Sequence, residues 1–277
     1  WATEDQTLLS MALAASRKAI ERSGIDPAQI NAVLVATGSH TRQFPSLAVS
    51  VAAGLGLKDP AATDLSAACA GFCYGVSLAD SMVRTGTAKN VLIVGVEILT
   101  RQTDFTDRGT AFLFGDGAGA VVVGPSETPG IGPVVWGSDG ESADVIWSDD
   151  WNEAFASGKK PVIHMEGNKV FRWATTFIAE KTAEALEAAG LKPEELDVFI
   201  PHQANNRITD SMLRRMHLPE SVVISRDIRQ MGNSSAASIP IAMEALLESG
   251  DAKSGDTALV IGFGAGLVYA GQVVVLP

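Results

Sequence analysis

A thiol lies among very small side chains in DLSAACAGFCYG, residues 64–75, a segment that otherwise has the composition of a buried helix. Cys69 can be structural, because unpaired cysteine is among the most buried residue types. It can equally be a nucleophile, because the amino terminus of a helix presents unpaired N–H groups and a positive dipole end that lower the pKa of a thiol. The surrounding Ala and Gly residues leave room for a substrate. Cys73, one turn further along, is expected to be a structural thiol.

Two further polar residues could complete a site around this thiol. His202 follows an apolar run in FIPHQAN, where a lone histidine is more often a hydrogen-bonded core residue than a catalyst. Asn233 lies in GNSSAASIP, residues 232–240, where its default role is to cap a helix. Each signal is weak alone. A thiol, an imidazole and a carboxamide brought together would support nucleophilic acyl transfer.

The elements that must position these residues occur twice along the chain. Residues 17–39 resemble residues 181–204, and residues 77–95 resemble residues 241–262. Each copy of the first pair reads as a helix ended by Gly, a turn with Pro and an apolar run typical of a buried strand. Helices alternating with strands predict an α/β protein with two sheets of similar build, packed through shared helices.

The repeated frame predicts that the three polar residues converge. Gly86 and Gly250 end equivalent helices, so counting back from them places Cys69 opposite Asn233, each at the start of its helix. The other repeat places His202 just beyond a buried strand. Functional groups gather at the carboxyl ends of strands and the amino ends of helices, so a pseudo-twofold between the halves would bring the three side chains together.

Composition limits the class of protein. The chain has 277 residues, 46% of them hydrophobic, without charge blocks or biased tracts, which indicates a globular protein. Two cysteines on one expected helix argue against a disulfide framework and for a reducing compartment, and no metal-ligand spacing is present. The net charge of −11 argues against non-specific nucleic-acid binding. No apolar run suits a membrane span and no signal peptide opens the chain, so we expect a cytoplasmic protein.

The sequence resembles β-ketoacyl-acyl carrier protein synthase III, the initiating condensing enzyme of bacterial fatty-acid synthesis within the thiolase superfamily. The resemblance spans essentially the whole chain. It implies a thiolase-like α/β fold of two pseudo-symmetric βαβαβαββ halves, residues 1–125 and 126–277, in an α-β-α-β-α arrangement. The matching stretches are DLSAACAGF (64–72), TDRGTAFLFGDGAGAVV (106–122), HMEGNKVFRWA (164–174), PHQANNRI (201–208), GNSSAASIP (232–240) and GFGAGLVYA (262–270).

The resemblance implies a role for each candidate residue. Cys69 would accept an acyl group from acyl-CoA as a thioester, and His202 and Asn233 would hold the thioester carbonyl of malonyl-acyl carrier protein. Decarboxylation leaves enolate charge on that oxygen, which two hydrogen-bond donors stabilise. Backbone N–H groups of Cys69 and Ala265 would form an oxyanion hole. The products would be β-ketoacyl-acyl carrier protein, CO₂ and CoA. The resemblance implies no cofactor, since acyl-CoA is a substrate.

Substrate and partner contacts also follow from the resemblance. Arg108 would bind CoA by stacking on its adenine, and Phe44 would limit the acyl pocket of the partner in a homodimer, although core packing is the ordinary explanation for a lone Phe. Basic residues at helical spacing have even odds of being a solvated face. The resemblance favours instead a docking patch for acyl carrier protein, formed by Arg172, Arg207, Arg214 and Arg215.

Two other observations bear on the fold. GDGAGA, residues 115–120, superficially suggests a nucleotide loop, but apolar residues of a strand follow it, so we expect tight strand packing. GPVVWG, residues 132–137, has no counterpart at the start of the earlier half, although family members carry a strand and CoA-binding residues there. We therefore expect a few dozen amino-terminal residues to be missing from the sequence.

Two alternative functions remain open at the level of the sequence. A non-decarboxylating acyltransferase would pass the Cys-bound acyl group to an alcohol or amine. A non-catalytic partner subunit would retain the fold alone, but it would have little need for a thiol at position 69.

Overall fold

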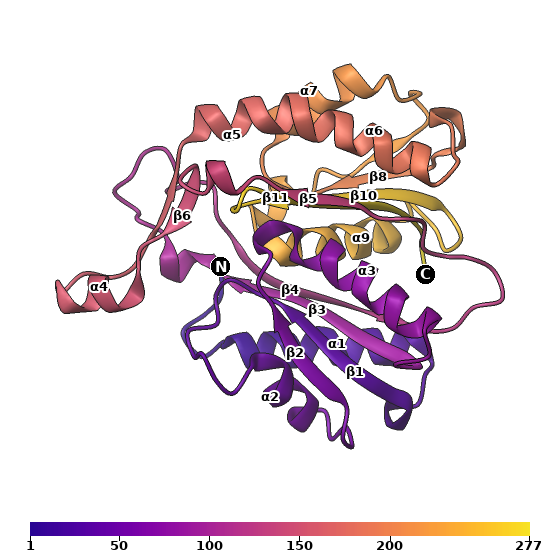
Figure 1. The fold of residues 1–277 in the computed structure, drawn as a ribbon, viewed down its shortest axis with the longest axis horizontal. Coiled ribbons are helices and arrows are strands. Elements are labelled where there is room, and N and C mark those ends of the chain that lie inside the picture. The colour runs from indigo at the N-terminus through magenta and orange to yellow at the C-terminus, as the bar shows by residue number, and fades with distance from the viewer.

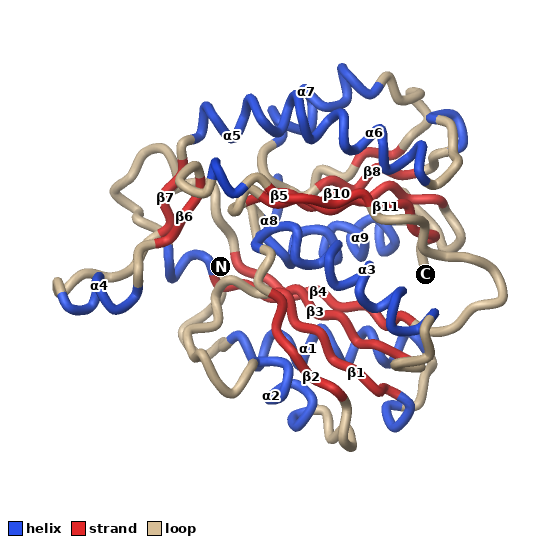
Figure 2. Tube along the Cα trace, viewed as in Figure 1, coloured by secondary structure: helices blue, strands red, loops and turns tan.

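Five alternating layers of helix and sheet make up the computed structural model, which describes residues 1–277 (Figures 1 and 2). The helices are α1 (Leu8–Ser23), α2 (Leu47–Gly54), α3 (Gly71–Arg84), α4 (Trp151–Ala156), α5 (Gly167–Trp173), α6 (Ala179–Ala188), α7 (Asn206–Met216), α8 (Ile228–Met231) and α9 (Ser238–Ser249). The strands are β1 (Ile30–Ala36), β2 (Ala61–Leu65), β3 (Asn90–Ile98), β4 (Asp116–Val123), β5 (Val135–Ser138), β6 (Ile146–Ser148), β7 (Ile163–Met165), β8 (Val198–Pro201), β9 (Val223–Ile224), β10 (Thr257–Gly264) and β11 (Val268–Val275).

The two main sheets have the same strand order. The first sheet runs β2-β1-β3-β4, and the second runs β9-β8-β10-β11 with β5 added at its edge. In each sheet the first three strands are parallel and the fourth is antiparallel. The first sheet has no strand equivalent to β5, as the sequence predicts. A separate pair, β6 and β7, carries α4 on an arm that extends from the body (Figure 1).

The helices form three layers around these sheets. Helices α1 and α2 cover the outer face of the first sheet, and α6 covers the second beside α5 and α7 (Figure 1). Helices α3 and α9 lie between the sheets and contact both. The predicted α/β class and its α-β-α-β-α layering are therefore confirmed. None of the helices is both long and apolar enough to cross a membrane.

The first repeat is confirmed residue by residue. Helix α1 is capped by Thr7 and followed by Gly24 in the left-handed conformation, and Gly190 follows α6 in the same conformation. A short 3-10 turn beginning with proline then leads into a buried strand in each half, at η1 (Pro27–Gln29) and η6 (Pro193–Glu195). Glycine suits these positions because it adopts positive φ without steric cost.

The second repeat has a different register at its start from the one predicted. The turns η2 (Ala68–Ala70) and η7 (Ser235–Ala237) precede α3 and α9, and each begins with a residue at positive φ, 43° at Ala68 and 47° at Ser235. The structural counterpart of Cys69 is therefore Ala236, and the predicted pairing with Asn233 is wrong by three residues. Helix α3 has 14 residues and is separated from Gly86 by Thr85, whereas α9 has 12 and is followed directly by Gly250, so counting back from the two glycines loses three residues of register.

GDGAGA packs tightly as a strand, as predicted. A Cβ atom added to Gly119 would lie 2.8 Å from the ring of Pro240, and one added to Gly117 would lie 2.5 Å from Ile241. Both of these neighbours are in α9. The glycines therefore let β4 approach the central helix layer closely.

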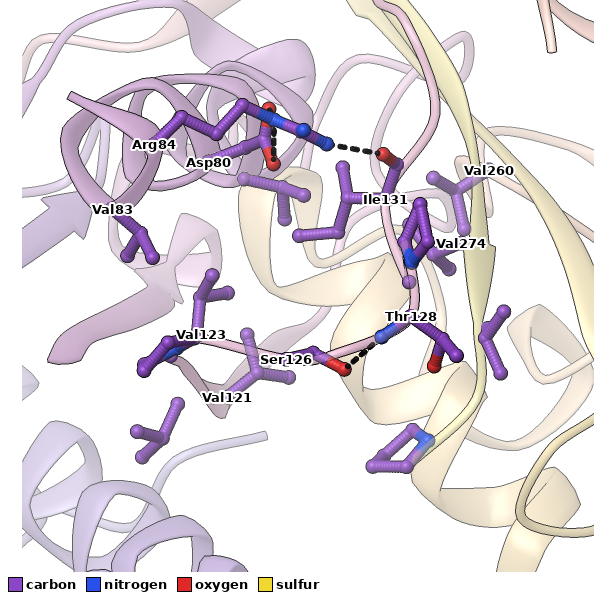
Figure 3. A pocket seen from close by; sticks show the side chains of 18 of the residues that line it. Asp80, Val83, Arg84, Val121, Val123, Ser126, Thr128, Ile131, Val260 and Val274 are labelled. Carbon is purple, nitrogen blue, oxygen red and sulfur yellow. Dashed lines mark hydrogen bonds and ion pairs between the residues drawn. The ribbon is translucent and has the colours of Figure 1, made fainter. Parts of the chain in front are cut away.

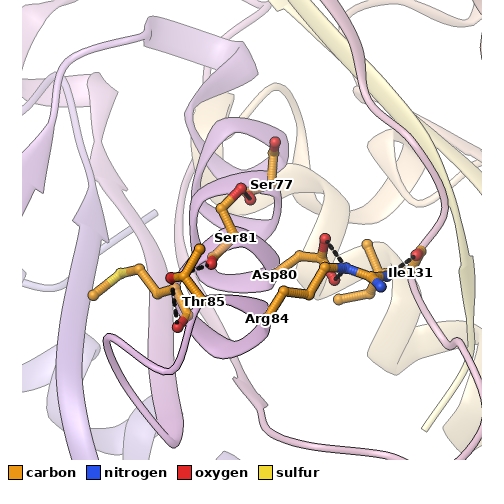
Figure 4. A network of polar contacts seen from close by, with 7 residues as sticks. Ser77, Asp80, Ser81, Arg84, Thr85 and Ile131 are labelled. Atoms are coloured by element: carbon orange, nitrogen blue, oxygen red, sulfur yellow. Dashed lines mark hydrogen bonds and ion pairs between the residues drawn. The ribbon is translucent and has the colours of Figure 1, made fainter.

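A cavity of about 450 Å³ lies at the carboxyl end of α3 (Figure 3). Its walls come from α3, β4, β11 and the connection 124–131, and they are mainly apolar. Arg84 at its rim donates to Asp80 at 2.7 Å and to the carbonyl of Ile131 at 3.2 Å, which ties α3 to that connection (Figure 4). Cys69 lies at the opposite end of α3, so this cavity is not part of the candidate site.

Gly262→Ala should destabilise the fold, because the new Cβ would lie 2.8 Å from the Ala70 Cα and 2.9 Å from the Cys69 carbonyl oxygen. We expect a loss of about 1–3 kcal/mol in the free energy of unfolding, measured by denaturant titration. Gly167→Ala is the matched control, because no atom lies within 4 Å of its added Cβ. Equal stability of the two variants would contradict this packing.

Candidate active site

Cys69 lies in η2, immediately before α3, where it packs against the end of β10. A Cβ atom added to Gly264 would lie 2.9 Å from the Cys69 Sγ, so only glycine allows this approach. Cys69 is partly exposed, whereas Cys73 is buried in the core between the sheets. Ala68, directly before Cys69, has a φ of 43°, a conformation that costs free energy for a residue with a side chain and is concentrated at functional sites.

The thiol is protonated in the free protein. Burial raises the pKa of Cys69 to about 12; a hydrogen bond with Ser235 opposes this rise, and the charge of Glu97 adds to it. This direction is opposite to the lowered pKa predicted from the helix amino terminus, because burial of the sulfur is the largest influence on the thiol. A thiolate has to form during the reaction itself.

His202 follows β8, and its backbone N–H donates to the carbonyl of Ile261 in β10 at 2.8 Å. Its side chain is 2% exposed, and Nδ1 lies 2.7 Å from the hydroxyl oxygen of Ser238 at the start of α9. That oxygen also accepts the Gln203 N–H at 3.3 Å, so the Ser238 hydroxyl proton can point at Nδ1. This arrangement leaves Nε2 as the protonated nitrogen.

The imidazole of His202 is neutral at physiological pH. Burial lowers the pKa of His202 to about 3, since no charged neighbour compensates for its desolvation. The ring meets Phe263 edge to face, with centroids 5.4 Å apart. His202 is therefore a fixed, neutral hydrogen-bond donor rather than an acid.

Asn233 is held by its own turn. Its Oδ1 accepts the backbone N–H of Ser235 at 2.9 Å, which leaves the Nδ2 protons as donors. Its backbone pairs with the segment before β4 through the Leu113 carbonyl and the Gly115 N–H, each at 2.9 Å. Asn233 is the N-cap residue of neither η7 nor α9, so the predicted N-cap position is wrong, although its side chain accepts the N–H of the first residue of η7.

The structure brings these three residues to one region between the sheets. The turns η2 and η7 contact each other and the adjoining strands, so the elements carrying Cys69 and Asn233 are neighbours. Strand β10 lies beside both Cys69 and His202. The backbone N–H groups of Cys69 and Ala265 donate to no backbone carbonyl, which leaves both available to a ligand.

The other candidate residues lie on the surface. Phe44 is 79% exposed in the loop before α2, so core packing is wrong for this side chain. Arg108 is exposed in the loop between β3 and β4. Four arginines at the outer helix layer are exposed and have no ion-pair partner: Arg172 on α5, and Arg207, Arg214 and Arg215 on α7.

The sequence predictions missed three polar residues of this region. Ser238 orients His202, Ser235 interacts with the thiol, and Glu97 on β3 is fully buried nearby. A signal was present for Glu97, because NVLIVGVEI places one carboxylate in a strand that is otherwise almost entirely apolar. The two serines lie in GNSSAASIP, where nothing distinguishes them from turn residues.

The sequence matches two models of one protein family. Residues 63–140 match 3-oxoacyl-[acyl-carrier-protein (ACP)] synthase III, and residues 186–276 match its C-terminal part. Among curated proteins, the chain is 55% identical to "Beta-ketoacyl-[acyl-carrier-protein] synthase III" of Streptomyces glaucescens and 49% identical to its namesake in Mycobacteroides abscessus. All of this chain is covered in both cases, with 84% and 83% of those relatives.

Solved structures lead to the same family. The priming β-ketosynthase of the R1128 polyketide biosynthetic pathway superposes with a TM-score of 0.97 at 46% identity, covering all of this chain and 84% of that one. The β-ketoacyl-[acyl carrier protein] synthase III of Thermus thermophilus superposes with a TM-score of 0.91 at 38% identity, covering all of this chain and 86% of that one. The chain belongs to the 3-oxoacyl-[acyl-carrier-protein] synthase III family of condensing enzymes.

Proposed function

We propose that this chain is an acyltransferase that condenses an acyl-CoA primer with malonyl-acyl carrier protein through an acyl-Cys69 thioester. The observation that carries the proposal is a thiol on a partly exposed residue at the start of α3, in the same region as two neutral donors, each of which is held by a hydrogen bond at its other polar atom. Ser238 holds His202 at Nδ1, and the Ser235 N–H holds Asn233 at Oδ1.

Acylation is the first step. The Cys69 sulfur attacks the thioester carbonyl of acyl-CoA, and negative charge develops on the carbonyl oxygen. The N–H groups of Cys69 and Ala265 receive that oxygen, since neither is used by a backbone carbonyl. The carbon–sulfur bond to CoA then breaks, and the acyl group remains on Cys69.

Decarboxylation and carbon–carbon bond formation follow. Nε2–H of His202 and Nδ2–H of Asn233 donate to the thioester carbonyl of the malonyl group. Loss of CO₂ leaves its electron pair in the enolate, whose oxygen charge both donors stabilise. The enolate carbon attacks the acyl-Cys69 carbonyl, and the sulfur departs as thiolate. The low pKa of His202 suits this role, because the ring donates a hydrogen bond without giving up its proton.

The two alternative functions are less well supported. A transferase that passes the acyl group to an alcohol or amine is not favoured, since the relatives are named as synthases of the condensing type. A non-catalytic scaffold is disfavoured by the partial exposure of Cys69 and by the close glycine packing that its turn requires.

Two surface residues are proposed to bind the primer. Phe44, exposed in this chain, would reach the acyl pocket of the partner subunit in a homodimer, where its size would limit the primer. Arg108 would stack on the adenine of CoA. These roles would explain why both side chains are exposed to solvent.

Acyl carrier protein is proposed to dock on α5 and α7. Helix α7 begins four residues after His202, so its arginines lie close in sequence to the site. Four unpaired guanidinium groups on a chain of net charge −11 form a local positive surface suited to an acidic carrier.

Mass spectrometry after incubation with a panel of acyl-CoAs tests the proposed activity. We expect one acyl group on Cys69, followed by release of CO₂ and formation of a β-ketoacyl thioester when malonyl-acyl carrier protein is added. A protein that acylates but releases no CO₂ would be the non-decarboxylating transferase. A Cys69 thiol that none of the acyl-CoAs acylates would indicate a non-catalytic partner subunit.

Asn233→Ala should leave the acylation rate of Cys69 nearly unchanged and slow condensation by about a hundredfold or more, because only the second step uses the Nδ2 donor. Acylation is measured by mass spectrometry, and condensation by release of labelled CO₂. Normal condensation by this variant would refute the role of Asn233.

Arg215→Glu should raise the KM for malonyl-acyl carrier protein while sparing the KM for acyl-CoA, with a difference that shrinks at high salt. Arg17→Glu is the matched control, because Arg17 is exposed on α1 at the opposite outer layer. The docking surface would be wrong if both variants behaved alike, or if Arg215→Glu affected both substrates equally.

A further inference from the structure

Glu97 is a buried carboxylate that the proposed reaction steps do not use. It lies one residue before the end of β3, and its side chain is fully buried. Taking a carboxylate out of water is costly unless several hydrogen-bond donors satisfy it. No basic side chain lies within ion-pair distance of Glu97. Its hydrogen bonds therefore show which part of the chain this carboxylate holds.

These hydrogen bonds reach three consecutive residues that follow β1. The Gly38 N–H lies 3.1 Å from both carboxylate oxygens of Glu97, and the Ser39 hydroxyl donates to one of them. The Thr37 hydroxyl lies 3.5 Å from that same oxygen. The Ser39 oxygen also accepts the N–H of Ile98, the residue after Glu97, at 3.1 Å. The turn that follows β1 is thus fixed on the end of β3.

A second carboxylate fixes the other end of the same loop. Asp64 of β2 accepts the backbone N–H groups of Leu47 at 2.7 Å and Ala48 at 2.8 Å, at the start of α2. Strands β2 and β3 lie on the two sides of β1. Residues 37–46, which we call the Phe44 loop, therefore leave the first sheet at one fixed point and return to it at another.

Between these two points the Phe44 loop has few attachments. It contains no helix or strand, and residues 41–45 are exposed. One hydrogen bond spans this exposed part, from His40 Nε2 to the carbonyl of Pro45 at 3.2 Å. Phe44 itself is 79% exposed. A change of direction at either anchored end would displace the Phe44 ring, because few other interactions hold it.

We propose that Glu97 is a positioning residue that sets the range of primers by holding the Phe44 loop. The proposal rests on the proposed function, in which Phe44 limits the acyl pocket of the partner subunit. An aromatic ring limits a pocket only where its own position is defined, and β3 defines that position through Glu97. Glu97 acts on the primer through this loop and not by contact with it.

The hydrogen bonds of Glu97 require an acceptor at both side-chain oxygens. Glutamine has nearly the same shape, but its NH₂ group can only donate. The Gly38 N–H faces both oxygens, so in either orientation of a glutamine amide the NH₂ group would oppose that N–H. At least one hydrogen bond to the turn would be lost. Glu97→Gln should therefore loosen the start of the Phe44 loop without leaving a cavity.

The alternative is that Glu97 only stabilises the first sheet. That role predicts lower stability and a similar change in acylation for every primer. The charge of Glu97 also acts on the Cys69 thiol. An effect on the thiol is common to all primers, so it cancels in the ratio of acylation by two of them. The ratio of a longer to a shorter primer is therefore the readout that a structural role would not change.

The test measures competitive acylation of Cys69 by an equimolar mixture of acetyl-CoA, butyryl-CoA and hexanoyl-CoA, read by mass spectrometry of the intact protein. We expect Glu97→Gln to raise the hexanoyl-to-acetyl ratio about tenfold or more, since a single methylene group in an apolar pocket carries about that much discrimination. Phe44→Ala should raise the ratio by a similar factor. Ser39→Ala removes one hydrogen bond of the turn and should raise it less.

The double variant Glu97→Gln/Phe44→Ala shows whether the two residues act together. Once the ring is removed, Glu97 has nothing left to position, so the double variant should have the ratio of Phe44→Ala alone. Asp116→Asn is the matched control. Asp116 is also buried, but it lies on β4 and accepts the N–H and the hydroxyl of Thr100, at 2.9 Å and 2.7 Å, outside the Phe44 loop. Its ratio should be that of the wild type.

Three outcomes would overturn the proposal: an unchanged hexanoyl-to-acetyl ratio in Glu97→Gln, effects that multiply in the double variant, or an equally altered ratio in Asp116→Asn. If Glu97→Gln does not fold, Ser39→Ala, alone and combined with Phe44→Ala, decides the question. A wild-type ratio in Phe44→Ala would refute the role of Phe44 and its positioning together. Absence of acylation in the wild-type protein would refute the proposed function, whereas normal acylation with a ratio that Glu97→Gln does not change would refute only the positioning.

Discussion

The close approach of β10 to the turn that carries Cys69 is the constraint on which the rest of the site depends. Gly262 and Gly264 leave no room for side chains, because the backbone of η2 occupies that space at Gly262 and the Cys69 side chain occupies it at Gly264. This contact joins the two halves, since η2 belongs to the first sheet's connections and β10 to the second sheet. The same strand accepts the backbone N–H of His202, so one element sets the positions of the Cys69 thiol and the imidazole together. Small residues around Cys69 are therefore required by the approach of the halves as well as by the substrate.

Burial keeps the Cys69 thiol and the His202 imidazole neutral, and this determines which reactions they can support. The thiol and the imidazole are both uncharged at neutral pH, because each would lose its hydration on ionising. Neutral donors suit an enolate that forms and disappears within one turnover, since they stabilise it without a permanent charge to desolvate. The consequence is that the Cys69 thiol would have to lose its proton as it reacts. Stability of the resting site and reactivity of the thiol are thus set by the same exclusion of water.

Much of the fold could be predicted from the sequence, because its signals are local. A glycine after a helix, a proline in the next turn and an apolar run recur in both halves, and each recurrence matches an element of the structure. The register of Cys69 against the second half could not be predicted, because it depends on how α3 and α9 differ in length and ending, and no residue type in the sequence indicates that difference. The raised thiol pKa was also out of reach, since burial is decided by the packing of η7 and β10 on a turn far away in sequence. The division at residues 125 and 126, and the roles of the individual site residues, stay predictions.

Charged side chains on the surface remain in water, so they are under different constraints from the buried groups of the site. Some basic side chains of this acidic chain form ion pairs, as Lys18 and Arg22 of α1 do with two glutamates of α9. The arginines of α5 and α7 have no such partners, although acidic residues outnumber basic ones by 32 to 21. An isolated surface arginine gains little from a distant carboxylate in salt solution, so leaving several unpaired costs the fold almost nothing. Three of the four lie on α7, the helix that follows His202, and this grouping concentrates positive charge on the surface where the acyl carrier protein is proposed to dock.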